Sequence, residues 1–194
     1  MFTYSKMQSV KYTEAPHSHY AVTYYTSVLW TRARQLMLQY QTEEIFDANE
    51  VIPGLYIGSL EAVYAKKELE KQGITHVVAV LAGFQPPFPE SFEYLVIGAM
   101  DSVCTELNKT FEEINGFIQE CFALDGKVLV ICMAGRSRSA TAVCAYIMKT
   151  LGVSPIKAIN LLQRGRNIVD PNPAFKQQLA EYFKYNGMDL SEHE

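Results

Sequence analysis

The chain has 194 residues, 48% of them hydrophobic and 20% charged, which fits one globular domain with a sizeable core. Its formal net charge of −4 argues against broad binding to nucleic acid, although it leaves room for a local basic pocket. The longest apolar runs, such as residues 77–82, are too short to cross a bilayer, and the polar, tyrosine-rich start does not fit a signal peptide. We therefore expect neither nucleic acid nor a membrane as a partner.

The composition divides the chain into an N-terminal extension, residues 1–45, a main domain, residues 46–187, and a tail, residues 188–194. The extension is rich in Tyr, Ser and Thr and nearly free of acidic residues. Apolar side chains recur in it at helical spacing: Val22, Tyr25, Leu29, Leu36 and Tyr40. This pattern predicts a helix over residues 21–40. We interpret it first as a helix packed on the main domain, and alternatively as a docking arm or an organelle-targeting segment.

Four apolar segments predict strands in the main domain: residues 54–59, 75–80, 92–98 and 126–132. The last segment is the most apolar, so we expect it at the centre of the sheet, where both of its faces are buried. Residues 83–91 contain three prolines and therefore predict a loop.

Capping signals place helices between and after these strands. Ser59 can begin a helix that ends at Gly73, and Gly152 can end another. Ser154 and Asn172 each precede a proline, as is typical of the first residues of a helix. The predicted helices cover residues 60–71, 107–118 and 137–151, with two more beginning after residues 154 and 172. The alternation predicts an α/β fold with a central, mostly parallel sheet of about four to five strands flanked by helices.

The bend after the most apolar strand is the first candidate site, because ligands of open α/β sheets bind beyond the carboxyl ends of the strands. Cys132 ends that strand, and small or polar residues separate it from Arg138. These residues are Met133, Ala134, Gly135, Arg136 and Ser137. Their backbone N–H groups can converge on one anion, toward which the next helix aims its positive N-terminus. Arg138 can add a bidentate fork for two phosphate oxygens.

The same surroundings activate the thiol. A free cysteine has a pKa of about 8.5, and a helix N-terminus with a nearby arginine can bring it below neutrality. The site would then combine a nucleophile with a phosphate cradle, and attack on phosphorus would give a phosphocysteine that water hydrolyses. Ser139 can donate a hydrogen bond to the sulfur. A structural buried cysteine is the alternative, but the pattern C-x-x-G-x-x-R-S between an apolar strand and an apolar helix disfavours it.

The segment CMAGRSRSATAVCAYIM resembles the signature of the cysteine-dependent protein tyrosine phosphatase superfamily, specifically its dual-specificity branch. The resemblance covers residues 49–185 and includes GLYIGS, MDSVCTELNKTF and RNIVDPNPAFKQQL. The short extension makes the chain similar to the small dual-specificity phosphatases. The resemblance implies a protein-tyrosine-phosphatase-like fold, with Cys132 as the nucleophile, Arg138 as the phosphate binder and Ser139 as a helper. Residues 133–137 would supply backbone donors.

The resemblance also implies a general acid and reveals one departure. Asp101, six positions before Leu107, matches the family's acid, and Glu106 and Asp170 are the alternatives. The family usually has a histidine just before the nucleophile, where this chain has Ile131. Isoleucine supplies no hydrogen bond, so we expect an active but slower enzyme whose thiol pKa is less depressed.

Several basic and polar residues near these motifs have simpler interpretations. Arg136 either lines the rim of the pocket or is a solvated arginine. Asn172 is expected to cap the last helix rather than to contact substrate. Arg164 and Arg166 are expected at a helix end, where their charges complement the helix dipole.

The leading interpretation is a phosphatase of phosphotyrosine and phosphoserine or phosphothreonine in proteins. The alternatives are a phosphatase of phosphoinositides, glucans or RNA ends, a phosphate-binding pseudophosphatase, and a sulfur-transfer enzyme. We expect no metal or other cofactor, because the arginine and the backbone donors can do that work. The four cysteines form no CxxC pair, which favours reduced thiols and a cytoplasmic or nuclear location. The sequence leaves the oligomeric state open.

Overall fold

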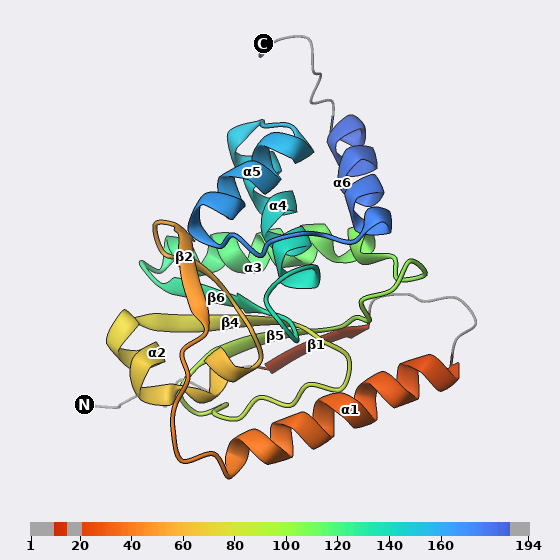
Figure 1. Ribbon diagram of the computed structural model, residues 1–194. Helices are drawn as coiled ribbons and strands as arrows, with labels where there is room; N and C mark the ends of the chain where they lie inside the picture. The colour runs from red at the N-terminus through yellow and green to blue at the C-terminus, as the bar shows by residue number, and fades with distance from the viewer. Residues whose placement is uncertain (1–9, 15–20, 187–194) are drawn as a thin grey trace.

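The computed structural model describes residues 10–14 and 21–186, which form a layered α/β domain (Figure 1). Its six-stranded sheet has the order β1-β5-β4-β6-β3-β2. All neighbouring strands are parallel except β2 and β3, which form an antiparallel hairpin. The predicted α/β fold with a mostly parallel sheet is confirmed, with one strand more than the upper expectation. The expected C-terminal tail lies outside the described residues.

The strands are β1 Val10–Glu14, β2 Ala48–Ile52, β3 Leu55–Gly58, β4 Ile74–Val80, β5 Glu93–Gly98 and β6 Lys127–Ile131. The α-helices are α1 Ala21–Gln39, α2 Lys66–Gln72, α3 Phe111–Ala123, α4 Arg138–Leu151, α5 Pro155–Gly165 and α6 Pro173–Tyr185. Two 3₁₀ turns, η1 Glu61–Tyr64 and η2 Leu107–Thr110, precede α2 and α3.

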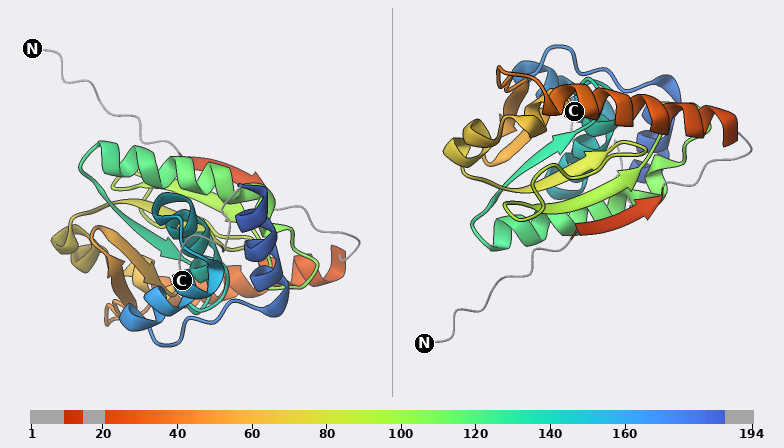
Figure 2. Two further views of the ribbon diagram at one scale, coloured as in Figure 1. Left: turned by 90° about the horizontal axis from the view of Figure 1, so that it is seen from above. Right: turned by 90° about the horizontal axis from the view of Figure 1, so that it is seen from below.

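The sheet separates two hydrophobic clusters. Helices α3, α4, α5 and α6 cover one face, and α1 and α2 lie on the other (Figures 1 and 2). Along β6, Val128 and Val130 face the first cluster, whereas Leu129 and Ile131 face the second, as the two-residue period of a strand requires. Burial on both faces explains the unbroken apolar run and confirms that β6 lies inside the sheet, between β4 and β3.

Helix α4 is enclosed in the first cluster, with most of its side chains buried. Among the described residues, no single helix has both the length and the apolar character of a membrane span. Helices α4 and α5 together meet these criteria, but they form a pair bent by 117°.

Four of the predicted helix boundaries are confirmed, whereas the helix predicted over residues 107–118 begins as the 3₁₀ turn η2 and continues as α3 to Ala123. Ser154 accepts a hydrogen bond from the backbone N–H of Lys157, and Asn172 accepts one from the N–H of Phe175, so each residue caps its helix. Gly73 and Gly152 end α2 and α4 with left-handed φ angles of 76° and 65°, which glycine adopts without strain.

The single helix predicted over residues 60–71 is wrong. The chain forms η1 and then the short helix α2, broken at Ala65, and neither is capped by the Ser59 side chain. The reason lies in tertiary contacts, because the backbone N–H of Ser59 bonds to the carbonyl of Asp47 at 3.0 Å and that of Leu60 to the carbonyl of Met133 at 3.2 Å. The first bond joins the segment to the residue before β2, and the second joins it to the loop after β6.

The helix predicted in the N-terminal extension is confirmed as α1, and it packs on the domain. However, the side chains of α1 that pack against the domain are not the apolar side chains whose spacing predicted the helix. Leu38 is buried on the sheet side with the polar Thr31 and Gln35, whereas Tyr25 and Leu29 are 65% and 67% exposed. The extension also contributes β1, which the sequence did not predict because VKYTE is a short, polar segment at the edge of the sheet.

Candidate active site

The loop between β6 and α4 encloses the Cys132 thiol. Cys132 follows β6 directly and is 2% exposed, and its sulfur lies 3.2 Å from the hydroxyl of Ser139 in the first turn of α4. Gly135 has a φ of 64°, and a Cβ there would lie 2.6 Å from the backbone of Gly58. The loop therefore needs glycine at this position to fold back against β3.

The surroundings of Cys132 favour the thiolate. Burial by itself raises the pKa of the thiol, but the positive charge of Arg138 and the hydroxyl of Ser139 lower it. Hydrogen bonds from the backbone N–H groups of Ser139 and Arg136 lower it as well, and the net pKa of Cys132 is below its ordinary value. The expected activation of the thiol by the loop and the helix N-terminus has its physical basis in these contacts.

Arg138 presents an unpartnered donor inside the loop. It is 6% exposed, and its Nη1 donates to the carbonyl of Ala99 at 3.1 Å. Its Nε is buried and has no hydrogen-bond partner among the described residues. A buried donor without a partner costs about 1–3 kcal/mol, so this atom fits a site built for an anion. Ser137 precedes α4 without a side-chain cap, which leaves the first N–H groups of that helix for the same anion.

Asp101, predicted as the general acid, is held over this loop by three residues. Its Oδ2 lies 3.8 Å from Nε of Arg138, and its Oδ1 accepts hydrogen bonds of 2.8 Å from the Ser137 hydroxyl and from Nδ2 of Asn172. Among the three candidate acids, Asp101 is the one that lies within ion-pair distance of Arg138. Glu106 pairs instead with Lys109 at 2.8 Å.

Asp170, the other alternative acid, belongs to an ion-pair network on the rim. Its carboxylate contacts Arg136 and Lys176, each at 2.8 Å, and these contacts lower the pKa of Asp170. Arg136 is thus exposed to solvent but paired on the rim. The two interpretations drawn from the sequence, a rim residue and a solvated arginine, are therefore both partly right. Asn172 caps α6 as predicted, and its side chain also holds Asp101, a second contact that the sequence did not suggest.

Arg164 and Arg166 lie at the end of α5 as expected, but Arg166 has a further role. Arg166 is 5% exposed at the end of α5 and donates to the loop carbonyls of Gly135 at 3.0 Å and Ala134 at 3.1 Å. Its Nη1 also bonds to Asp47 at 2.9 Å and to Asn49 at 2.8 Å. The bonds from Arg166 are the main reason why the pKa of Asp47 is lowered.

These bonds orient the loop. In a trans peptide the C=O and N–H groups point in opposite directions, so carbonyls turned toward Arg166 send the next N–H groups into the loop. The N–H of Arg136, which bonds to the Cys132 sulfur, is one of them. The sequence could not reveal this support, because Asp47 and Arg166 lie 119 positions apart and neither belongs to a recognisable motif.

Ile131, the departure from the family pattern, is fully buried. It faces the second hydrophobic cluster and pairs with Gly58 of β3 and Ala79 of β4. Its side chain gives the loop no hydrogen bond, so the thiol is activated by Arg138, Ser139 and backbone groups alone. A slower enzyme stays a prediction.

The lowered pKa predicts how Cys132 reacts with an alkylating agent. A lowered pKa keeps the thiolate populated at lower pH, so the rate of iodoacetamide modification is expected to rise with an inflection below the value of about 8.5 for free cysteine. Cys121 is the internal control, because burial raises its pKa to about 11. An inflection for Cys132 at or above that of free cysteine would contradict the activation described above.

Comparison with known proteins identifies the domain that carries this site. Residues 55–185 match the family described as dual specificity phosphatase, catalytic domain. The chain is 40% identical over 138 residues to dual specificity protein phosphatase 1B of Arabidopsis thaliana, with 71% of this chain and 83% of that protein covered. It is 37% identical over 137 residues to human dual specificity protein phosphatase 22, with 71% and 74% covered.

Solved structures agree with the sequence matches. The crystal structure of the human tyrosine phosphatase-like serine/threonine/tyrosine-interacting protein superposes with a TM-score of 0.71 at 33% identity, covering 73% of this chain and 99% of that one. The structure of DUSP15 superposes with a TM-score of 0.68 at 34% identity, covering 70% and 86%. The matched region contains Cys132, Arg138 and Asp101, and the chain belongs to the dual specificity phosphatase family.

Proposed function

We propose that Cys132, Arg138, Asp101 and Ser139 carry out the dual-specificity protein phosphatase reaction of this chain, on phosphotyrosine and on phosphoserine or phosphothreonine in proteins. Membership of the family makes the chain a cysteine-dependent protein phosphatase. One observation supports the assignment of residues most directly. The thiol with a lowered pKa and the unpartnered Nε of Arg138 lie in the same buried loop.

In the first step the Cys132 thiolate attacks the phosphorus of the bound phosphate ester. The new S–P bond forms as the P–O bond to the substrate side chain breaks, and Asp101 gives its proton to the departing oxygen. Arg138 and the backbone N–H groups of the loop bind the phosphoryl oxygens throughout and stabilise the charge of the transition state. The products of this step are the dephosphorylated protein and a phosphocysteine.

In the second step water attacks the phosphocysteine. The Asp101 carboxylate, which gave up its proton in the first step, accepts a proton from that water. The same group thus acts as the acid in the first step and as the base in the second. The S–P bond breaks, and the electron pair returns to the sulfur. The Ser139 hydroxyl, 3.2 Å from the sulfur, stabilises the departing thiolate by a hydrogen bond, and inorganic phosphate leaves.

The Asp101→Asn variant tests the proton donor. Asparagine keeps the size of the side chain and can still bond to Ser137, but it has no acidic proton to give to the leaving group. Turnover of a phosphoserine peptide, whose alkoxide is a poor leaving group, is expected to fall by about 10²–10⁴-fold, and that of p-nitrophenyl phosphate much less. Glu106→Gln is the matched control and should keep the parent activity. If Asp101→Asn turned over both substrates as fast as the parent chain does, Asp101 would not be the proton donor.

The charges around the loop favour protein substrates over polyanionic ones. Arg136 is the only cation in the loop besides Arg138, and Asp170 already pairs with it at 2.8 Å. A phosphoinositide headgroup carries further phosphates that need further cations, and the net charge of −4 does not favour them. Turnover should therefore be measured on phosphotyrosine and phosphoserine peptides, a phosphoinositide, a phosphorylated glucan and a 5′-phosphorylated RNA. Preferential hydrolysis of a non-protein substrate would overturn the proposal.

We expect the enzyme to work in the cytoplasm or the nucleus, without a metal, another cofactor, nucleic acid or a membrane. The four cysteines are free thiols, and attack on phosphorus needs Cys132 reduced. Fractionation of cells that express the chain, followed by a phosphatase assay with and without a chelator, tests both expectations. Activity confined to an oxidising compartment, or lost on chelation, would contradict them.

A further inference from the structure

Helix α1 turns its apolar side chains outward. Seven large hydrophobic residues along it and just after it are 56–80% exposed: Val22, Tyr25, Leu29, Trp30, Leu36, Met37 and Tyr40. We call them the α1 stripe. The exposed residues Thr26 and Ala33 lie between them on the same side of the helix. The family domain begins at residue 55, so the α1 stripe lies outside the part of the chain that matches the phosphatase family.

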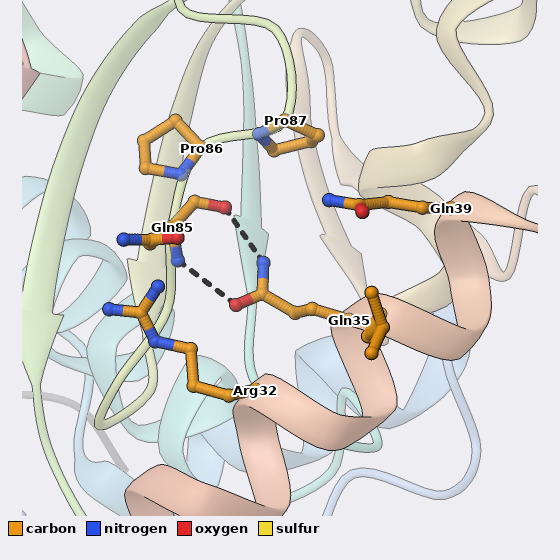
Figure 3. Close-up of a pocket in the computed structure, with 7 residues that line it drawn as sticks. Arg32, Gln35, Gln39, Gln85, Pro86 and Pro87 are labelled. Carbon is orange, nitrogen blue, oxygen red and sulfur yellow. Dashed lines mark hydrogen bonds between the residues drawn. The ribbon is translucent and has the colours of Figure 1, made fainter.

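Polar contacts fix this orientation of α1. The Gln35 side chain donates to the carbonyl of Gln85 at 2.7 Å and accepts from its N–H at 3.0 Å, and the two residues face each other below Pro86 and Pro87 (Figure 3). Arg34 pairs with Glu61 in the turn before α2. Rotating the helix to bury the stripe would break these bonds and leave buried polar groups unpaired, which is unfavourable.

The stripe is larger than a monomer usually exposes. Seven large side chains of roughly 200 Å² each, 56–80% exposed, leave on the order of 900 Å² open to solvent. The largest apolar patch of a typical monomer is roughly 300–600 Å², whereas a stable protein–protein interface buries about 800 Å² on each partner. Figures 1 and 2 show α1 on the outside of the molecule, with no other described element over its outer side.

We propose that α1 is a homodimerisation surface, in which the stripe packs antiparallel against the stripe of a second copy. A two-fold axis at the level of residue 31 places a large residue opposite a smaller one at three contacts: Leu29 with Ala33, Leu36 with Thr26, and Tyr40 with Val22. At a fourth contact Tyr25 faces Met37, whose flexible side chain can adapt to the ring. Alternation of large and small side chains lets two helices interdigitate, so the stripe is complementary to itself.

The charges of α1 favour a second copy over a lipid surface. Residues 21–39 contain no acidic side chain, and their cations are Arg32 and Arg34. Arg34 is paired with Glu61, and Arg32 points toward the loop of Gln85 (Figure 3). Neither arginine lies on the outer side beside the stripe, where an interfacial membrane helix needs cations to meet anionic headgroups.

The chain contains one tryptophan, and it lies in the proposed interface. Sedimentation of the full chain should show a dimer, and dilution should shift the Trp30 emission to longer wavelength as the indole becomes exposed.

Leu36→Glu should weaken dimerisation on the order of 100-fold, because each dimer buries the added charge twice. Leu151→Glu is the matched control, since Leu151 is 57% exposed and Leu36 is 56% exposed. It should leave the dimer unchanged.

Three outcomes would overturn the proposal. One is a chain that stays monomeric at micromolar concentration while retaining phosphatase activity. Another is a monomer that sediments with vesicles of phosphatidylcholine and phosphatidylserine. A dimer that Leu36→Glu leaves intact would equally exclude α1 as its interface.

Cross-linking tests the antiparallel arrangement. The Leu29→Cys and Ala33→Cys variants are mixed, oxidised and separated on a non-reducing gel, with the parent chain as the background. Residues 29 and 33 of different copies face each other in the proposed pair, so the mixture should cross-link better than either variant alone. Preferential cross-linking of each variant with itself would indicate a parallel pair and overturn the proposed packing.

Discussion

The Cys132→Ser variant is expected to lose phosphatase turnover by at least about 10⁴-fold while still binding phosphopeptides. The serine hydroxyl stays protonated at neutral pH, so the loop that stabilises a thiolate at this position has no nucleophile to activate. Arg138 and the backbone N–H groups remain in place, since Cys132 is a small, buried residue at the end of β6. Turnover of a phosphotyrosine peptide and its Kd for the same peptide, measured in parallel, separate chemistry from binding.

Cys121→Ser is the control for this variant. Cys121 lies in α3, outside the loop, and its sulfur is 3.8 Å from the Thr75 hydroxyl, a contact that a serine can keep. Activity should remain close to that of the parent. If the parent chain binds phosphopeptide but turns over no faster than Cys132→Ser, the chain is a phosphate-binding pseudophosphatase and the proposed mechanism fails.

Arg138→Lys is expected to lower kcat/KM by about 10²–10³-fold, although the charge is conserved. The guanidinium performs two tasks at once, because Nη1 holds the carbonyl of Ala99 while Nε has no hydrogen-bond partner among the described residues and can bind an anion. One ammonium group cannot both keep that carbonyl and present a fork to two phosphate oxygens. The lysine ammonium would not hold its positive charge in the position of the guanidinium, so the pKa of Cys132 should also rise. The pH profile of alkylation would reveal this change.

Arg136→Lys in the same loop is the matched control. Arg136 is exposed and paired with Asp170, and its backbone N–H, which bonds to Cys132, is unaffected by the substitution. The activity of the Arg136→Lys variant should stay within a few-fold of that of the parent chain. The unfolding midpoint of Arg138→Lys must also be compared with the parent, because Arg138 is buried. Unchanged kcat/KM in a folded Arg138→Lys protein would show that the fork is not needed.

The strand, loop and helix around Cys132 were predictable because they are contiguous in the chain. The apolar run of β6, the small residues after it and the Gly152 stop of α4 each depend on neighbours a few positions away. Asp101 was predicted through the family resemblance, since an aspartate before a helix is by itself an ordinary residue. Its partners Ser137 and Asn172 were not assigned to it, because nothing in their local sequence points toward β5.

By itself the sequence determined the α/β alternation, the most apolar strand and the caps of α5 and α6, and it pointed to the candidate nucleophile, because periodicity and capping act over one or two turns of chain. The tertiary structure decided that Arg166 and Asp47 brace the loop from two distant segments and that α1 lies with its apolar side outward. The hydrophobic period of a helix shows that one side is apolar, but the bonds of Gln35 and Arg34 to the domain determine which side faces it.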